Sequence, residues 1–258
     1  MYPYRVLFDL GMYEVLLVLG FVFALIYFRL LADRAGFGAS LQNICILGGL
    51  VGLIGGYTMA VVTQAIYNAI ASGHFEIASN TGATFYGGLV GGIGFYVLFY
   101  FLAGRFFLSR GEAKSNFGRM SDIAAGAIAL AHAFGRIGCL FAGCCHGAVT
   151  NAWYGIYHVR MQVKVIPVQL YEAIFLLALS AALTLRFLRG KRKGLAVYMV
   201  AYAIWRFLAE YLRADDRGST VVSFLSPSQL TSVLLLLVGA AILLYPSVMR
   251  KWREHHES

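Results

Sequence analysis

Residues 132–146 read HAFGRIGCLFAGCCH, a stretch that combines one arginine, two histidines and three of the four cysteines of the chain. The rest of the sequence is strongly apolar: of 258 residues, 60% are hydrophobic and only 13% are charged. A water-soluble domain does not need this balance to bury its core. The stretch therefore belongs to a polytopic membrane protein, in which polar side chains are costly and usually face a bundle interior or a watery cavity.

Seven apolar stretches are long enough to cross the hydrocarbon core as helices, which takes about 20 residues each. We predict an all-α protein with transmembrane helices over residues 11–31, 43–70, 84–104, 121–141, 167–188, 195–213 and 227–247. The first stretch does not resemble a cleavable signal peptide, because no small-residue cleavage pattern follows it. Residues 1–258 are expected to form one transmembrane domain, with 141–166 as an outside loop segment.

Lysine and arginine residues are concentrated in four segments that lie on one side of a seven-span arrangement, and this asymmetry predicts the orientation. They follow the first, third, fifth and seventh stretches, whereas residues 71–83 contain none. The N-terminus is therefore predicted outside and the C-terminus in the cytoplasm. The net charge of +9 is mostly explained by this topology, in which basic residues on the cytoplasmic side are attracted to anionic lipid headgroups. No nucleic-acid partner is therefore expected.

Two of the predicted helices carry polar residues at helical spacing, which places them along one face of each helix. The first set is His132, Arg136 and Cys139, and the second is Tyr202, Arg206, Glu210 and Arg213. An arginine on each helix indicates an anion site, and a guanidinium group can hold two oxygens of a phospholipid phosphate at once.

Other interpretations of the arginines remain open. Arg206 and Arg213 could form an internal network with Glu210, or they could extend to the outer interface. Arg136 has no carboxylate within one helical turn on either side, so a substrate is a candidate to compensate its charge.

The cysteine-rich half of the opening stretch allows several chemistries. Cys139, Cys144, Cys145 and His146 could chelate a soft metal, although their spacing is not the paired C-x-x-C pattern of structural zinc sites. Cys139 or Cys144, close to Arg136, could instead be a nucleophile or act in redox chemistry. The alternative is that the cysteines are small apolar packing residues, which is our interpretation for Cys45. No cofactor is expected.

Glycines concentrate in two of the predicted helices. They are Gly48, Gly49, Gly52, Gly55 and Gly56 in the second, and Gly87, Gly88, Gly91 and Gly92 in the third. Small residues at such spacings let helices approach closely in lipid, so we interpret them first as packing residues.

Several motifs occur in a fixed order along the chain. They are GRIGCLFAGCCHG at 135–147, IPVQLYE at 166–172, RFLAEYLR at 206–213 and SQL at 228–230. In this order, and with Tyr13 in the first span, the sequence resembles the prolipoprotein diacylglyceryl transferase family. These membrane enzymes move a diacylglyceryl group from phosphatidylglycerol to a lipobox cysteine, and the resemblance covers most of the chain.

The chain departs from the family pattern at residues expected to carry chemistry. A His-Gly-Gly motif of the family is Tyr86-Gly87-Gly88 here, and Cys139 and Cys144 stand where the family has Asn and Glu. Tyr86 would orient groups or relay a proton in place of the histidine, although a phenol with a pKa of about 10 is a poor base at neutral pH.

The resemblance implies an enzyme that holds the phosphate of phosphatidylglycerol near Arg136 and Arg206 while a thiolate attacks the glyceryl carbon. Tyr86, Cys139 and Cys144 complete the catalytic residues that we predict. The predicted substrate-binding residues are Tyr13, Gly87, Gly88, His132, Gly135, Gly138, Gly143, Gln169, Tyr171, Glu172, Tyr202, Glu210 and Arg213.

The expected partners are phosphatidylglycerol or a similar anionic phospholipid, and a lipobox-type peptide or another thiol acceptor, in the bacterial inner membrane. Two alternatives keep the fold. One is a paralogue that uses Cys139, Cys144 and Cys145 for a different thiol-based lipid transfer or a redox reaction. The other is a non-catalytic protein that binds or transports lipid or a soft metal.

Overall fold

A computed structural model of the chain describes residues 5–7, 10–73, 85–213 and 224–256, with side chains described for 11–70, 73, 87–213 and 224–245. Two compact units emerge, one formed by residues 1–31 with 121–258 and the other by residues 32–120. The prediction of a single domain stays a prediction.

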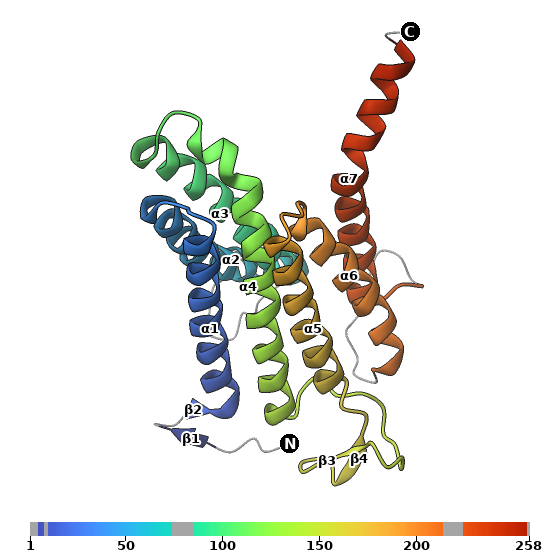
Figure 1. The fold of residues 1–258 in the computed structure, drawn as a ribbon. Coiled ribbons are helices and arrows are strands. Elements are labelled where there is room, and N and C mark those ends of the chain that lie inside the picture. Colours follow the sequence, from blue (N-terminus) through green and yellow to red (C-terminus); the bar gives the residue numbers. More distant parts are fainter. Residues whose placement is uncertain (1–4, 8–9, 74–84, 214–223, 257–258) are drawn as a thin grey trace. The chain divides into compact units, whose positions relative to one another are not determined.

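Seven helices in the described part of the chain are long and apolar enough to cross a membrane, which confirms the predicted fold class (Figure 1). They are α1 Met12–Arg34, α2 Ala39–Ser72, α3 Phe85–Phe107, α4 Glu112–Ala142, α5 Val168–Leu188, α6 Gly194–Ala209 and α7 Pro227–His256. Helix α4 begins nine residues before the predicted start at residue 121. The polar run EAKSNFGRM at 112–120 is helical, and a hydropathy criterion registers only the apolar part of a helix.

The unit formed by residues 32–120 contains two helices in direct backbone contact. A Cβ atom added to Gly52 in α2 would lie 3.0 Å from the carbonyl oxygen of Gly92 in α3, and one added to Gly56 would lie 2.9 Å from that of Gly88. Side chains larger than hydrogen have no room there. The packing interpretation of the glycine clusters is therefore confirmed for Gly52 and Gly56, where an added Cβ would meet the backbone of α3.

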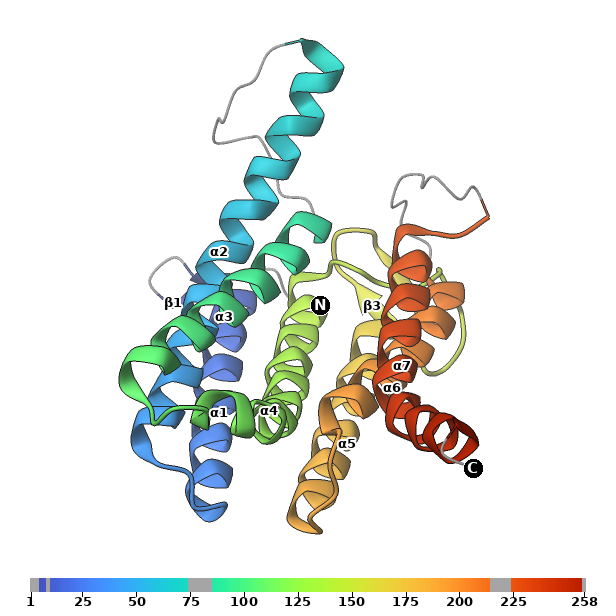
Figure 2. The same cartoon turned by 90° about the horizontal axis from the view of Figure 1, so that it is seen from above.

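The other unit is built around the second part of α4. Ser180 in α5 donates a hydrogen bond to the carbonyl oxygen of Gly126 at 2.9 Å, and the amide of Gly194 at the start of α6 donates to Asp122 Oδ1 at 2.6 Å. Gly20 in α1 faces the same helix, because an added Cβ would lie 3.1 Å from the carbonyl oxygen of Ala131. Helix α4 thus contacts α1, α5 and α6, and α6 lies beside α7 (Figure 2).

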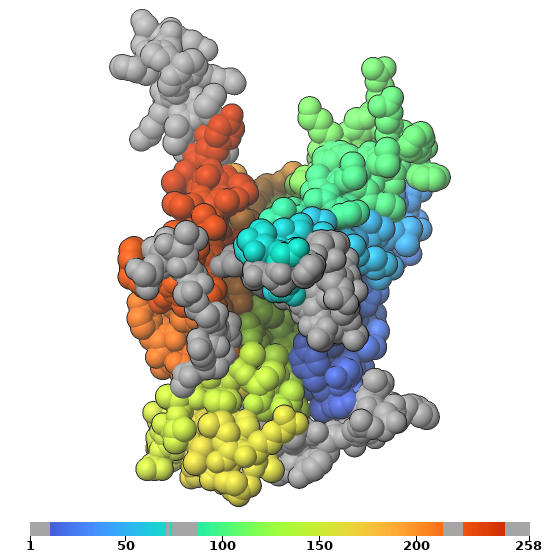
Figure 3. Space-filling view, turned by 180° about the vertical axis from the view of Figure 1, so that it is seen from behind, coloured from blue at the N-terminus to red at the C-terminus, as the bar shows by residue number. Residues whose placement is uncertain are grey.

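Short strands accompany the helices. β1 (Arg5–Leu7) pairs with β2 (Leu10–Gly11), and β3 (Ile156–His158) pairs antiparallel with β4 (Val163–Val165). The segment after α4 runs along the second hairpin, with isolated bridges from Val149 to Val165 and from Gly147 to Arg213. Figure 3 shows this connection to α5 as one continuous patch in yellow-green and yellow. The predicted outside loop at 141–166 thus contains a hairpin that the sequence does not indicate.

Candidate functional site

The carboxylate of Glu172 joins three helices of the unit that contains α4. This side chain in the first turns of α5 is fully buried. Its Oε1 accepts a hydrogen bond from the Tyr202 hydroxyl of α6 at 2.9 Å and lies 3.1 Å from Nε of Arg136 in α4. A buried carboxylate is tolerated when it is paired and hydrogen-bonded in this way. Three of the predicted site residues therefore meet at one oxygen atom.

His132 completes this cluster, one helical turn before Arg136. Its Nε2 accepts a second, longer hydrogen bond from Arg136 Nε at 3.3 Å, which requires the neutral ring to carry its proton on Nδ1. The imidazole ring also lies edge-on to the ring of Tyr202, with 5.0 Å between centroids. His132 Nε2 is 3.9 Å from Glu172 Oε1, too far for a hydrogen bond. We therefore assign it as a hydrogen-bond acceptor.

The charge of Arg136 is compensated within the protein. A substrate was the expected source of the compensating charge, because α4 itself offers no nearby carboxylate. Glu172 supplies that carboxylate from another helix, which corrects the expectation. The Arg136 side chain still keeps 16% of its surface exposed, so the pair does not enclose the guanidinium group completely.

Arg206 forms a second cluster at the junction of α6 and α7. Its Nη2 lies 2.7 Å from Glu210 Oε2 and donates to the Ser228 hydroxyl at 2.6 Å, and Ser226 donates to the other oxygen of Glu210 at 2.7 Å. The predicted pairing of Arg206 with Glu210 is confirmed. Among the described residues, Nη1 of Arg206 is buried without a hydrogen-bond partner. A buried donor of this kind needs an acceptor.

Arg213 is not part of the same helical face, contrary to the predicted register. Helix α6 ends at Ala209, a 3-10 turn (η1) covers Glu210–Leu212, and Arg213 is extended, with φ −91° and ψ 151°. Its backbone forms a β-bridge with Gly147, and the amide of Ala148 donates to the carbonyl oxygen of Leu212 at 3.1 Å. Backbone pairing with a distant segment ends the helix here, and helical spacing cannot reveal such pairing.

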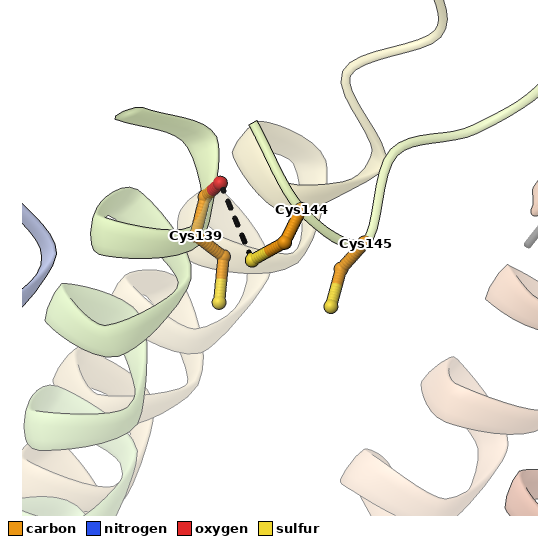
Figure 4. A group of neighbouring side chains, drawn as sticks. All are labelled: Cys139, Cys144 and Cys145. Carbon is orange, nitrogen blue, oxygen red and sulfur yellow. Dashed lines mark hydrogen bonds between the residues drawn. The ribbon is translucent and has the colours of Figure 1, made fainter. Parts of the chain in front are cut away.

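The three cysteines of the opening stretch gather where α4 ends. Gly143, at φ +74°, ends the helix in the left-handed conformation that glycine adopts readily. The Sγ atoms of Cys139, Cys144 and Cys145 all lie within 4.8 Å of one another (Figure 4). His146 is not in this group. Its Nδ1 lies 3.0 Å from the carbonyl oxygen of Gly147.

The thiol of Cys145 is electrostatically distinct. Hydrogen bonds from Cys139 and Cys144, together with the charge and hydrogen bonding of Arg213, hold the pKa of Cys145 below that of an ordinary thiol. Gln169 anchors the same segment from α5, because its Nε2 donates to the carbonyl oxygen of Cys144 at 2.6 Å. The predicted residues Gln169, Cys144 and Arg213 are thus brought together around this segment.

The remaining predicted residues occupy several positions. Tyr13 in α1 packs against Gly138, where an added Cβ would lie 3.0 Å from the tyrosine ring, whereas the space beside Gly135 is open. Tyr171 is partly buried in the first turn of α5. Gly87 packs against Thr63 and Met59 of α2.

Tyr86 lies in the first turn of α3. Its side chain is outside the described residues. Tyr86, Gly87 and Gly88 belong to residues 32–120, and their predicted catalytic or substrate-binding roles stay predictions.

Sequence reasoning missed Ser226, Ser228 and Tyr198 as members of the site. Tyr198 stacks on Tyr202 with 5.8 Å between ring centroids and 2° between ring planes, and its position one helical turn before Tyr202 was a usable signal. Ser228 was noticed only as part of the SQL motif. Ser228 contacts Arg206 from a different helix, and a contact between helices cannot be predicted from spacing along one helix.

Comparisons with known proteins agree with the motifs. The model of the family described as prolipoprotein diacylglyceryl transferase matches residues 4–245. "Phosphatidylglycerol--prolipoprotein diacylglyceryl transferase 2" of Clostridium perfringens is 33% identical over 243 residues, covering 90% of this chain and 89% of the relative. The Clostridioides difficile protein named phosphatidylglycerol--prolipoprotein diacylglyceryl transferase is 30% identical over 246 residues, covering 94% and 93%.

The two matches extend over about nine-tenths of each relative, and the residues of the Glu172 and Arg206 clusters lie within the span that the family model matches. This chain, with seven helices that can span a membrane and with this family match, therefore belongs to the prolipoprotein diacylglyceryl transferase family.

Proposed function

We propose that this chain transfers a diacylglyceryl group from phosphatidylglycerol to the lipobox cysteine of a prolipoprotein in the bacterial inner membrane. The observation that carries the proposal is the buried Arg206. It is only 6% exposed, and its Nη1 has no hydrogen-bond partner among the described residues. A phosphate oxygen is the acceptor that best suits a guanidinium donor inside a membrane.

The chemistry follows from the two arginines. The acceptor thiol gives its proton to water, and the resulting thiolate attacks the glyceryl carbon. A carbon–sulfur bond forms as the carbon–oxygen bond to the phosphate breaks, and glycerol phosphate departs with the electron pair. Arg206 and Arg136 stabilise the negative charge that grows on the departing phosphate, which is the form of electrostatic help that dominates many active sites.

The surrounding residues hold these arginines in position. Glu172 fixes Arg136, and Glu210 with Ser228 fixes Arg206, so neither guanidinium group has to reorganise when the substrate binds. We place the end of α4 and residues 143–166 at the outer face, with the N-terminus outside and the C-terminus in the cytoplasm, because the positively charged connections lie on the other side.

The test uses purified full-length protein in liposomes. Phosphatidylglycerol labelled in its glycerol headgroup and a lipobox peptide are supplied, and released glycerol phosphate and lipidated peptide are both measured. We expect release that depends on the peptide cysteine. Arg206→Lys, which keeps the charge but loses the forked geometry, is expected to lower turnover by about 10²–10³-fold.

Arg110→Ala is the matched control, because Arg110 is exposed on the connection after α3 and should keep full turnover. A folded wild-type protein that releases no glycerol phosphate would refute the proposal. Full activity of Arg206→Lys would remove Arg206 from the mechanism.

A further inference from the structure

The proposed transfer reaction assigns no role to the cluster of Cys139, Cys144 and Cys145. All three are free cysteines, and Cys144 is exposed while the other two are partly buried. Their sulfur atoms come from two places, the last turn of α4 and the chain just beyond it, and they share one space (Figure 4). Three soft donor atoms within 4.8 Å of one another are a set that can hold a thiophilic cation.

The backbone that carries these thiols is held in place by its neighbours. Cys145 has a φ of +62°, a conformation that a non-glycine residue keeps only when the surroundings impose it. His158 Nε2 lies 2.7 Å from the carbonyl oxygen of Gly143, and Gln169 binds the carbonyl oxygen of Cys144. The amide of Gly147 donates to Ile166 at 2.9 Å. The backbone that carries the three cysteine ligands is therefore held in place before any metal binds.

The size of the group suits zinc. Zinc–thiolate bonds are about 2.3 Å long, so tetrahedral coordination places the sulfur atoms about 3.8 Å apart. The observed group needs to contract by at most about 1 Å to reach that geometry. Three protein ligands with the fourth position left open is the arrangement of catalytic zinc sites, whereas structural sites use four.

The positions of the charged groups favour a negatively charged metal–thiolate centre. Cys139 follows Arg136 by one turn of α4, and the two side chains interact electrostatically. Arg213 also interacts electrostatically with Cys145. Two arginines of the same unit thus compensate negative charge at the three cysteines.

We propose that Cys139, Cys144 and Cys145 bind one zinc ion as thiolates, and that the open fourth position takes the thiol of the acceptor cysteine. Zinc binding releases three thiol protons, and coordination of the acceptor releases one more, so the metal holds the acceptor as a thiolate at neutral pH. The coordinated sulfur attacks the glyceryl carbon, the carbon–oxygen bond to the phosphate breaks, and the thioether product leaves the metal. This role rests on the proposed transferase function.

The experiment follows the metal by a signal that does not depend on turnover. Full-length protein is purified under reducing conditions, stripped with a chelator and titrated with Co²⁺, whose thiolate charge-transfer bands report sulfur coordination. Zinc is then added as a competitor. We expect one Co²⁺ per chain, displaced by one equivalent of zinc. Cys139→Ser, Cys144→Ser and Cys145→Ser are each expected to weaken binding about 100-fold or more, because losing a ligand costs more than losing an outer partner.

Cys45→Ala is the matched control, since it removes the remaining thiol, which is buried in α2, and should keep the titration unchanged. A lipobox peptide added to the cobalt protein is expected to strengthen the charge-transfer bands, and the same peptide with serine in place of cysteine should not. Absence of stoichiometric binding, or binding that survives all three serine variants, overturns the site. An unchanged spectrum with the cysteine peptide overturns the open position.

The two proposals fail in different ways. A protein that binds cobalt through the three cysteines and takes up the peptide thiol, yet releases no glycerol phosphate with zinc bound, refutes the transferase function and leaves the metal site standing. A protein whose full transferase activity persists after stripping and in all three serine variants overturns the zinc proposal and leaves the transferase function standing.

Discussion

Removing the carboxylate of Glu172 is expected to destabilise the protein strongly. The side chain is fully buried, and one of its oxygens lies 2.9 Å from the Tyr202 hydroxyl and 3.1 Å from Arg136 Nε. Glu172→Ala leaves the Tyr202 hydroxyl without its acceptor and a largely buried guanidinium group without its counter-charge. Loss of one partner of a buried ion pair costs about 3–5 kcal/mol, and we expect a loss of that size in the free energy of unfolding.

Two further variants separate charge from hydrogen bonding. Glu172→Gln keeps an acceptor oxygen for Tyr202 but removes the negative charge, so it should lose less than Glu172→Ala. The double variant Glu172→Ala with Arg136→Ala removes the uncompensated charge as well. Its loss is therefore expected to be smaller than the sum of the two single losses, by about 1–3 kcal/mol.

The assay is reversible unfolding in mixed micelles, followed by helix content and by tryptophan fluorescence. Glu14→Ala is the matched control, because Glu14 is an exposed carboxylate in the first turn of α1 and should change stability by no more than about 0.5 kcal/mol. The reasoning is refuted by a Glu172→Ala loss below about 1 kcal/mol, or by single losses that simply add in the double variant.

Three further predictions concern the backbone and the thiol segment. Gly56→Ala should destabilise the protein by about 1–2 kcal/mol, because its Cβ would lie 2.9 Å from the carbonyl oxygen of Gly88. Gly49 has open space around it, so Gly49→Ala should be neutral or stabilising. Equal melting points of the two variants would contradict this prediction. Gln169→Leu is expected to weaken cobalt binding by about 10–100-fold without changing its stoichiometry, and an unchanged titration would disprove the anchoring role. Cys145→Gly should keep the melting temperature, whereas Cys145→Val should lower the stability by about 1–3 kcal/mol, because a β-branched residue disfavours a positive φ. A valine variant more stable than the glycine variant would be inconsistent with the observed backbone.

The sequence was sufficient for features that depend on local patterns. Seven helices followed from apolar length, and the face shared by His132 and Arg136 followed from helical spacing. The pairing of Arg136 with Glu172 could not be predicted from spacing alone, because it depends on how α4 packs against α5. The end of α6 before Arg213 was missed for a similar reason, since the bridge partner Gly147 is distant in sequence.

The cysteines could be predicted only in part from local sequence patterns, because their arrangement also depends on contacts with distant segments. Their number and proximity in the sequence indicated unusual chemistry but left metal, redox and packing roles open. The convergence of Cys139, Cys144 and Cys145 depends on the left-handed turn at Gly143 and on the anchor from Gln169. Composition alone does not determine where a chain reverses direction.

The backbone pairing of Gly147 with Arg213 and with Ile166 has a consequence for how this protein diverged. Hydrogen bonds between main-chain groups do not depend on the identity of the side chains they carry. The segment after α4 is held by such bonds, so a substitution at Cys144 leaves these bonds in place, and a substitution at Cys145 does so where the new residue tolerates the positive φ. Natural variation can therefore exchange the chemistry presented at this position while the surrounding helices keep their arrangement, and new reactivity arises without a new fold.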